Sequence, residues 1–287
     1  MSANPHPRPS VAHSIAALRE TVRQWRRAGE SVAMVPTMGA LHQGHLDLVR
    51  AGLARRDRVV VSIFVNPAQF APHEDFDAYP RTLDSDLDKL AGVGADVVFA
   101  PSAREMYPEG FATRIVPEGA ALGLETDFRP HFFGGVATVV AKLLLACLAD
   151  DAMFGEKDYQ QLAVVRQLVR DLNIPTEIVG CPTTREADGL AMSSRNAYLT
   201  AAERAAAPVL HAAMQDAARA IRGGAMIEVA LAPARERILA AGFRDLNYLV
   251  VRHAVTLAEV KDPASEPMRM LVAAWIGKTR LIDNIAV

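Results

Sequence analysis

Short runs of β-branched residues alternate with helical patterns over the first two thirds of the chain. The run at residues 59–65 is apolar at nearly every position, which is typical of an interior strand in a parallel sheet. Further strands are predicted at residues 32–35, 97–100, 152–154 and 177–179. Helices are predicted between them at residues 15–29, 46–56, 84–90, 136–148 and 157–172. The alternation predicts a doubly wound α/β fold, in which crossover helices join parallel strands.

The pattern changes after Gly189. Two alanine-rich helical stretches precede three apolar runs, at residues 201–221 and 227–241 and at residues 246–251, 270–276 and 280–285. Gly277 and Lys278 separate the last two runs closely enough for a hairpin turn. Proline, threonine and glycine interrupt regular structure at residues 182–189. We therefore predict a Rossmann-like domain at residues 1–183 and a smaller α+β domain, acting as a lid, at residues 184–287.

Composition and charge exclude several classes of protein. The 287 residues are 51% hydrophobic and 22% charged, which excludes a disordered tail, a fibre and a disulfide-stapled miniprotein. The net charge is −2, so no overall field draws the chain to nucleic acid or to anionic lipid. The longest apolar run, at residues 136–149, contains Lys142 and is shorter than the roughly 20 residues of a membrane-spanning helix.

The cysteines and the first residues indicate a cytoplasmic protein. Cys147 and Cys181 are far apart in apolar surroundings, so neither a zinc knuckle nor a disulfide framework is expected. The first ten residues are polar and proline-rich, which argues against a signal peptide. We expect a reduced, cytoplasmic setting.

A glycine-rich segment, PTMGALHQGH at residues 36–45, follows a predicted strand and precedes a predicted helix. Open α/β sheets bind ligands at this position, where helix amides point outward. Gly39 and Gly44 would let the backbone approach an anion, and His42 and His45 would project from one helix face. The segment therefore favours a nucleotide phosphate site. The alternatives are a helix cap with one surface and one core histidine, or a metal site, which normally needs a third ligand.

Two carboxamides follow the buried strand in the segment SIFVNPAQF at residues 62–70. Asn66 and Gln69 would emerge at the same sheet edge as the histidines. Amides both donate and accept hydrogen bonds, which suits the hydroxyl and carboxylate groups of a small polar substrate. The alternative is an Asn-Pro turn in which Asn66 bonds to its own backbone.

Lys157 lies at a predicted helix start, in the segment GEKDYQQL at residues 155–162. The helix dipole repels a cation at this end, and a bound polyphosphate would remove that penalty. Gln161 lies one helical turn beyond Lys157 on the same face. Asp158 suits the same helix end, with a helix cap as its alternative role.

A fourth segment, READGLAMSSRN at residues 185–196, lies at the predicted domain join. Two serines and an arginine would form a flexible phosphate clamp, and a hinge would let it close over a nucleotide. An ordinary polar linker is the alternative for this segment taken alone. Four such segments on one sheet edge together favour a nucleotide-binding enzyme.

In their order along the chain, these segments and DAYPRT at residues 77–82 resemble the pantothenate synthetases of the nucleotidyltransferase superfamily, which carry a His-x-Gly-His motif. The resemblance implies an ATP-dependent ligase. Pantoate and ATP would give pantoyl adenylate and pyrophosphate, and the amine of β-alanine would then release pantothenate and AMP. Mg²⁺ accompanies ATP in this family, whose members are homodimers, and neither a nucleic acid nor a membrane is an expected partner.

The resemblance also implies roles for individual residues. The implied catalytic residues are His42, with the role of proton donor, and His45, Lys157 and Arg195. ATP would contact Pro36, Thr37, Met38, Gly39, His42, His45, Gly155, Glu156, Lys157, Asp158, Thr184, Met192, Ser193, Ser194 and Arg195. Pantoate or β-alanine would contact Met38, Asn66, Gln69 and Gln161. Asp86 is the candidate Mg²⁺ ligand, beside phosphates and water. Phe132 stands where the family has histidine, with His131 one position earlier.

Three other functions stay open on the sequence. One is a related adenylyl transferase that acts on a nucleotide precursor. The second is a nucleotide-binding regulator without catalysis, which would bind ATP and show no pantoate-dependent turnover. The third is a two-histidine metal hydrolase.

Overall fold

The structure is a computed structural model that describes residues 6–70, 76 and 79–287. By its internal contacts the chain forms two compact units. The first unit comprises Met1–Gly155 and Val164–Cys181, and the second comprises Glu156–Ala163 and Pro182–Val287. The domain boundary after residue 183 stays a prediction.

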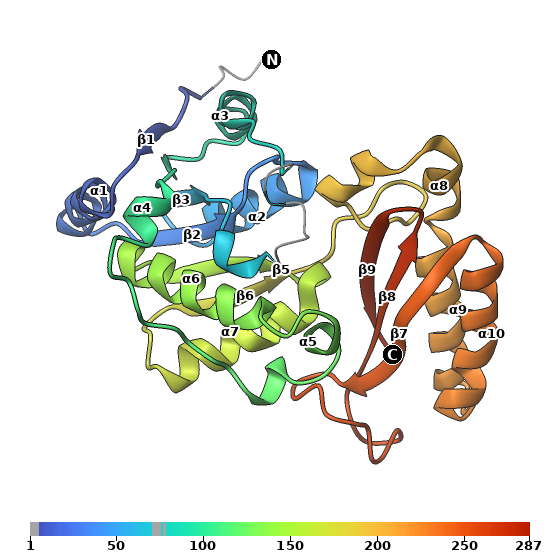
Figure 1. The fold of residues 1–287 in the computed structure, drawn as a ribbon. Helices are drawn as coiled ribbons and strands as arrows, with labels where there is room; N and C mark the ends of the chain where they lie inside the picture. Colours follow the sequence, from blue (N-terminus) through green and yellow to red (C-terminus); the bar gives the residue numbers. More distant parts are fainter. Residues whose placement is uncertain (1–5, 71–75, 77–78) are drawn as a thin grey trace. The chain divides into compact units, whose positions relative to one another are not determined.

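The first unit contains a six-stranded sheet (Figure 1). Its strands are β1 (Ser10–Ala12), β2 (Val32–Thr37), β3 (Arg58–Ile63), β4 (Val97–Phe99), β5 (Asp151–Gly155) and β6 (Glu177–Cys181). Every neighbouring pair is parallel, in the order β1-β4-β3-β2-β5-β6. This confirms the doubly wound sheet. Strand β1 escaped prediction because it has only three residues and pairs with a single neighbour.

The strand order reverses between β2 and β5, which are neighbours in the sheet. The chain adds β3 and β4 on one side of β2 and then adds β5 and β6 on the other. Open α/β sheets bind ligands at such a reversal, outside the carboxyl ends of the strands. The residues that follow Thr37 in β2 and Gly155 in β5 are therefore candidates for ligand binding.

Helices connect these strands. They are α1 (Ile15–Arg27), α2 (Gln43–Leu53), α3 (Leu83–Ala91), α4 (Ala103–Met106), α5 (Glu125–Phe128), α6 (Phe132–Cys147) and α7 (Tyr159–Asp171). The five predicted helices correspond to α1, α2, α3, α6 and α7, whereas the four-residue helices α4 and α5 were not predicted. Helix α1 begins after Ser14, whose side chain accepts a hydrogen bond from the amide of Ala17. Helix α2 begins three residues earlier than predicted because His42 caps it. Short 3₁₀ turns are η1 (Pro67–Gln69), η2 (Gly119–Ala121), η3 (Glu156–Asp158) and η4 (Ser194–Tyr198).

The second unit contains a three-stranded antiparallel sheet with helices packed against it (Figure 1). Its elements are α8 (Ala201–Ala206), α9 (Val209–Arg222), α10 (Ile227–Ala240), β7 (Phe243–His253), β8 (Met268–Ile276) and β9 (Thr279–Ala286). Ile276 pairs with Thr279 across the predicted hairpin turn, which is confirmed. The single helix expected at residues 201–221 is wrong. It is two helices separated at Pro208, which has no amide hydrogen to continue the first.

Two expectations from composition can be compared with the fold. Cys147 and Cys181 are both buried with reduced thiols, and burial raises the pKa of the Cys147 thiol to about 12. Among the described residues, no helix combines the length and the apolar character that crossing a bilayer requires. The cytoplasmic location stays a prediction.

A buried carboxylate anchors β5 beside β2. The Asp151 side chain is fully buried and accepts hydrogen bonds from Arg55 Nε, at 2.6 Å, and from Arg56. Burial alone would raise the pKa of Asp151, but the hydrogen bonds and charges of Arg56 and Arg55 outweigh it and lower the pKa. The ionised form is therefore favoured by folding, and it stabilises the fold wherever the unfolded carboxyl is also ionised.

We expect Asp151→Asn to lower the free energy of unfolding at pH 7 by about 3 kcal/mol. This is the lower end for breaking a buried pair, because both guanidinium groups stay partly in water. The folded-state pKa lies below the unfolded value of about 4, so the wild-type advantage is complete above that pH and is lost as the pH falls through the folded pKa. Urea unfolding at several pH values measures this. The exposed Asp171→Asn variant should differ from wild type by less than about 0.5 kcal/mol, and an Asp151→Asn deficit that persists undiminished at low pH would contradict the charge-based origin.

Candidate active site

The loop after β2 turns through a left-handed conformation. Gly39 and Ala40 have φ values of +85° and +50°. The amides of Ala40 and Leu41 each donate to an oxygen of Asp86 at 2.9 Å. A Cβ atom at Gly39 would lie 3.1 Å from Ile63 Cγ2 and 3.3 Å from Asp86 Oδ2, in addition to the backbone strain. Glycine is therefore required there for the turn itself.

Asp86, on helix α3, is fully buried and uses both oxygens to hold this loop. Besides the two amides, it accepts from Thr82 Oγ1 at 3.1 Å and from Lys89 Nζ at 3.5 Å. Lys89 also donates to the carbonyl of Leu41 at 2.8 Å. Mg²⁺ at this carboxylate would have to displace these donors, so the geometry favours a structural role over a metal role. The described part of the chain contains no cluster of three His, Cys, Asp or Glu side chains that could hold a metal ion.

The two histidines form a reciprocal cap at the start of α2. His42 Nδ1 accepts from the amide of Gly44 at 3.2 Å, and His45 Nδ1 accepts from the amide of His42 at 3.3 Å. The ring centroids lie 4.1 Å apart. Because each Nδ1 accepts a backbone hydrogen, each neutral ring carries its proton on Nε2. Nε2 of each half-buried imidazole is thus a hydrogen-bond donor in the neutral form, which is the polarity that a phosphate site needs.

The histidines, and not the loop amides, are therefore the donors that this segment offers to an anion. The amide of Gly39 donates to Thr37 Oγ1 at 3.2 Å, and those of Ala40 and Leu41 donate to Asp86. The helix-cap interpretation of His42 is confirmed, but it does not compete with phosphate binding because capping uses the other ring nitrogen.

The two carboxamides lie at η1, after β3. Asn66 is 1% exposed, and its Oδ1 accepts from the amide of Ala68 at 3.2 Å. The alternative interpretation of Asn66, a bond to its own turn, is thus confirmed. Its Nδ2 donates to Gln69 Oε1 at 3.1 Å, and Gln69 Nε2 lies 3.2 Å from Met38 Sδ. The structure therefore places Gln69 in contact with Met38 in the loop after β2, and Asn66 contacts Gln69 at its other end.

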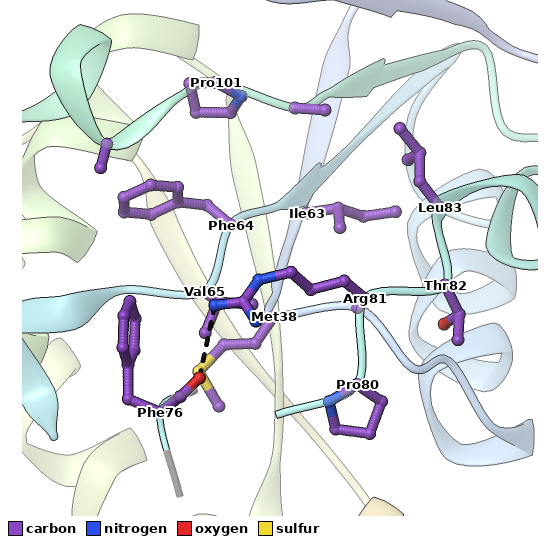
Figure 2. A pocket seen from close by; sticks show the side chains of 13 residues that line it. Met38, Ile63, Phe64, Val65, Phe76, Pro80, Arg81, Thr82, Leu83 and Pro101 are labelled. Carbon is purple, nitrogen blue, oxygen red and sulfur yellow. Dashed lines mark hydrogen bonds between the residues drawn. The ribbon is translucent and has the colours of Figure 1, made fainter. Parts of the chain in front are cut away.

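A cavity of about 300 Å³ borders the same loop (Figure 2). Met38, Ile63, Phe64 and Val65 line it, together with Gly39, Phe76, Pro80, Arg81, Thr82, Leu83, Ala100, Pro101 and Ala103. Figure 2 shows the Arg81 guanidinium donating to the carbonyl oxygen of Phe76, at 3.3 Å. The lining is mostly apolar, so the cavity suits an aliphatic group better than a polyphosphate. Part of its lining comes from the segments at residues 36–45, 62–70 and 77–82, but the sequence did not indicate that these segments enclose a cavity.

In the second unit, the turn η3 carries Lys157, whose side chain is 18% exposed. Asn284 of β9 holds this turn from within the fold. Its Nδ2 donates to the carbonyls of Glu156, at 2.8 Å, and Lys157, at 2.9 Å. Its Oδ1 accepts from Arg269 Nε at 2.6 Å. One buried carboxamide thus holds two successive backbone carbonyls, one on each side of the Lys157 Cα atom.

The segment at residues 184–196 also belongs to the second unit and forms a closed hairpin. Arg185 bridges to Ala191, and the amide of Met192 donates to the carbonyl of Thr184 at 3.0 Å. The Arg185 guanidinium makes a bidentate ion pair with buried Asp283, at 2.7 and 2.8 Å. Ser193 caps η4 by accepting from the amide of Arg195 at 3.2 Å. The segment predicted as a flexible clamp is therefore held at its base by the last strand.

Comparisons with known proteins match this chain over nearly its whole length. The family model for pantoate–β-alanine ligase covers residues 10–286. The chain belongs to this family. The pantothenate synthetase of Bradyrhizobium sp. strain BTAi1 is 59% identical over 280 residues, which are 97% of this chain and 99% of the relative. The pantothenate synthetase of Caulobacter vibrioides is 56% identical over 281 residues, with the same coverage of both chains.

Solved structures of pantoate–β-alanine ligases have the same fold. The pantothenate synthetase of Thermus thermophilus has a TM-score of 0.90 at 46% identity, covering 96% of this chain and 98% of that one. The pantoate–β-alanine ligase of Francisella tularensis has a TM-score of 0.81 at 35% identity, covering 97% of both chains. The Francisella protein was solved in complex with β,γ ATP and β-alanine.

The residues that the ligase resemblance predicted for the site fall in both units, and each group lies within its own unit. The first unit brings together the loop of Met38 and Gly39, the histidine pair and Gln69. The second contains η3 with Lys157, and the hairpin with Ser193–Arg195. Gln161 lies on α7, in the part of that helix assigned to the second unit. The roles of these residues toward substrates stay predictions.

Several residues that support the site were absent from the predicted set. Tyr107 donates to Asn66 Oδ1 at 2.7 Å. Arg129 Nη2 donates to the carbonyl of Gln69 at 3.4 Å, and its guanidinium lies 3.8 Å above the ring of Phe132. Phe132, which departs from the family pattern, thus packs against an arginine that contacts the Gln69 backbone. Only the deviation at Phe132 gave a sequence signal here, and it did not identify the partner.

We expect Asp86→Asn to loosen the loop after β2. An asparagine can accept from only one of the Ala40 and Leu41 amides and turns its own N–H groups toward the other, which leaves a buried donor unpaired. The free energy of unfolding should fall by about 2 kcal/mol, and ATP affinity by roughly 10-fold, because the histidine pair depends on the loop.

Thermal unfolding and calorimetric ATP titration measure the two Asp86 effects. The matched control is Asp84→Asn on the same helix, whose side chain is 94% exposed and which should behave as wild type. An Asp86→Asn protein of unchanged stability that had lost only its dependence on Mg²⁺ would support the metal role instead.

We expect Asn284→Asp to disturb the Lys157 turn. The aspartate still accepts from Arg269, but it places a carboxylate oxygen against the carbonyls of Glu156 and Lys157, where two donated hydrogen bonds are lost. ATP affinity should fall by about 10-fold. The control is Asn247→Asp, because Asn247 only accepts, from Arg280 Nε at 2.8 Å, and aspartate retains that bond. Equal ATP affinity in both variants would show that Asn284 does not position Lys157.

Proposed function

We propose that the protein is a pantoate–β-alanine ligase, which forms pantothenate from pantoate, β-alanine and ATP through a pantoyl adenylate. The observation that carries the proposal is the His42–His45 pair, whose Nδ1 atoms both accept backbone hydrogens beside the strand-order reversal, in a chain that belongs to this family over residues 10–286. The relatives named pantothenate synthetase and the Francisella complex with β,γ ATP and β-alanine support the substrates.

In the first step, a carboxylate oxygen of pantoate attacks the α-phosphorus of ATP and pyrophosphate leaves. The attack needs an in-line approach and neutralisation of charge that grows on the phosphate oxygens. We assign neutralisation to the Nε2–H groups of His42 and His45 and to the ammonium of Lys157. Gln69 and Gln161 would hold the acid in place, with Met38 beside Gln69.

In the second step, the β-alanine amine attacks the carbonyl carbon of the adenylate and AMP leaves. The adenylate is already activated, so an enzyme nucleophile is not required, and the protein has to hold the amine and exclude water. Arg195 would contact the phosphate of the leaving AMP. His42 would donate from Nε2 to that phosphate, and the proton that the amine loses would pass to the departing AMP. The full proposed ATP contact set is Pro36, Thr37, Met38, Gly39, His42, His45, Gly155, Glu156, Lys157, Asp158, Thr184, Met192, Ser193, Ser194 and Arg195.

Mg²⁺ would enter as MgATP, held chiefly by phosphates and water. The buried Asp86 carboxylate does not fit as its ligand, because protein donors already engage both oxygens. The homodimeric state rests on the resemblance to the family, and the cytoplasmic location rests on the two separate, reduced cysteines.

The test is pantoate-dependent exchange of pyrophosphate into ATP, followed by AMP release on addition of β-alanine. We expect exchange only with pantoate and MgATP, and AMP only when β-alanine is also present. His42→Ala and Lys157→Ala should each reduce exchange by at least about 100-fold, because each removes a donor to the transition state.

The melting temperature of Lys157→Ala should stay close to wild type. That of His42→Ala should fall by only a few degrees, because the variant loses the cap of α2 and no core packing. Exchange driven by a nucleotide precursor in place of pantoate would indicate a different adenylyl transferase. ATP binding without any turnover would indicate a regulator, and stoichiometric zinc in protein purified without chelator would indicate a metal hydrolase.

A further inference from the structure

Tyr107, Asn66 and Gln69 form a chain of hydrogen bonds within the first unit. The Tyr107 hydroxyl donates to Asn66 Oδ1 at 2.7 Å. Asn66 Nδ2 donates to Gln69 Oε1 at 3.1 Å and to the carbonyl of Gly135 at 3.2 Å. Gln69 Nε2 continues the chain toward Met38 Sδ, at 3.2 Å. This series of hydrogen bonds begins at Tyr107, directly after α4, and ends at Met38 in the segment proposed to bind substrate.

Backbone groups fix the direction of this chain. Asn66 Oδ1 faces the amide of Ala68, which can only donate, and Nδ2 faces the carbonyl of Gly135, which can only accept. If the Asn66 amide were rotated by half a turn, its NH₂ group would face the Ala68 amide, another donor, and its oxygen would face the Gly135 carbonyl, another acceptor. The Asn66 side chain is 1% exposed, so water cannot compensate for a mismatch. Its orientation is therefore determined by the fold.

The fixed Asn66 in turn determines which side of Gln69 faces Met38. Asn66 offers only N–H groups toward Gln69, so the Gln69 atom beside it is Oε1. The Nε2 group then points away from Asn66, toward the weak acceptor sulfur of Met38. A ligand next to Met38 thus meets a donor, which suits a carboxylate or hydroxyl oxygen and disfavours an ammonium group.

The close packing of α6 against η1 keeps this arrangement in place. A Cβ atom at Gly135 would lie 2.2 Å from the carbonyl oxygen of Ala68 and 2.8 Å from the Cα of Gln69. Glycine is required here because the two backbones touch. The contact holds the Gly135 carbonyl at hydrogen-bonding distance from Asn66.

Tyr107 is suited to act as a permanent donor in the chain. Burial raises the pKa of its phenol to about 12, so the hydroxyl keeps its proton over the working range of enzymes. Asn66 Oδ1 is an acceptor only, so the Tyr107 proton points toward it. The influence of Tyr107 on Gln69 in this chain passes through Asn66.

We propose that Asn66 and Tyr107 are positioning residues that hold the Gln69 carboxamide with its NH₂ group toward the acid substrate. This rests on the proposed function, in which Gln69 contacts pantoate. Asn66 then acts on pantoate through Gln69 instead of touching it. These three side chains give the site a preference for the acid over its primary amide, because the Gln69 NH₂ group donates to a charged oxygen in the acid and only to a neutral carbonyl oxygen in the amide.

The test is a double-mutant cycle between Asn66→Asp and Gln69→Ala, read as pantoate affinity by calorimetry, which needs no turnover. The introduced carboxylate would present only oxygen, so Gln69 would rotate and turn its own oxygen toward the acid. We expect pantoate affinity to fall by about 10- to 100-fold in Asn66→Asp. In the Gln69→Ala background the same change should alter affinity by less than about 3-fold, because the group it acts through is gone.

A second readout is the preference for pantoate over its primary amide. Rotation of Gln69 should reduce this preference by about 10-fold in Asn66→Asp, an effect that general loosening of the fold does not produce. Asn247→Asp, the same chemical change on β7, should leave both affinities at the wild-type level.

If Asn66→Asp fails to fold, the same cycle is measured with Tyr107→Phe in its place. This substitution removes one hydroxyl and should weaken pantoate binding by about 3- to 10-fold, again only when Gln69 is present. Tyr248→Phe in β7 is its control. Equal losses with and without Gln69 would overturn the positioning roles. Wild-type protein that shows no pantoate-dependent exchange would instead overturn the proposed function, and the two failures are thus distinguishable.

Discussion

The buried carboxylate of Asp86 determines the shape of the loop on which the histidine pair depends. An alanine in the left-handed region is strained by about 1 kcal/mol, and Ala40 is held there, at φ +50°. Two hydrogen bonds from backbone amides to an ionised carboxylate, each worth about 1.5 to 3 kcal/mol, outweigh that strain. The chain then enters α2 with His42 at the cap position, so the placement of both imidazoles follows from the Asp86 contact.

In the second unit, too, one buried polar side chain holds the backbone of a short turn. There a neutral carboxamide, Asn284, holds two carbonyls of η3 and thereby the backbone of Lys157. In both cases one buried polar side chain from a distant element replaces the hydrogen bonds that a regular helix or strand would provide. A short turn has too few internal bonds to resist the forces of a charged ligand, so support from outside the turn is what preorganises it.

The sequence predicted elements well where burial alone determines them. The parallel strands are continuous apolar runs, and the residues near Gly277 form the expected hairpin. The alanine pattern predicted one helix across Pro208, but the helix ends there. The pattern indicates which positions are buried, and it does not show that proline lacks the amide hydrogen a helix needs. The candidate segments were predictable because each follows a strand. Their supports were not, since Asp86 and Ala40 are 46 residues apart and Asn284 and Lys157 are 127 apart. Contacts at such separations leave no periodic trace in the chain.

Histidine and glutamine side chains can each donate or accept hydrogen bonds. At His42, His45 and Gln69, neighbouring groups determine which atom donates and which accepts. The amides of Gly44 and His42 occupy Nδ1 of the two imidazoles, and Asn66 occupies the oxygen of Gln69. Each side chain is left with a donor on its other side. A site built from such donors favours oxygen anions whatever their exact identity, and it discriminates against an ammonium at the same point. On the proposed assignment, in which these donors face the acid and the phosphates, the ammonium group of bound β-alanine is expected on a different side of the acid, so the polarity of the fixed donors would also separate the two substrates in space.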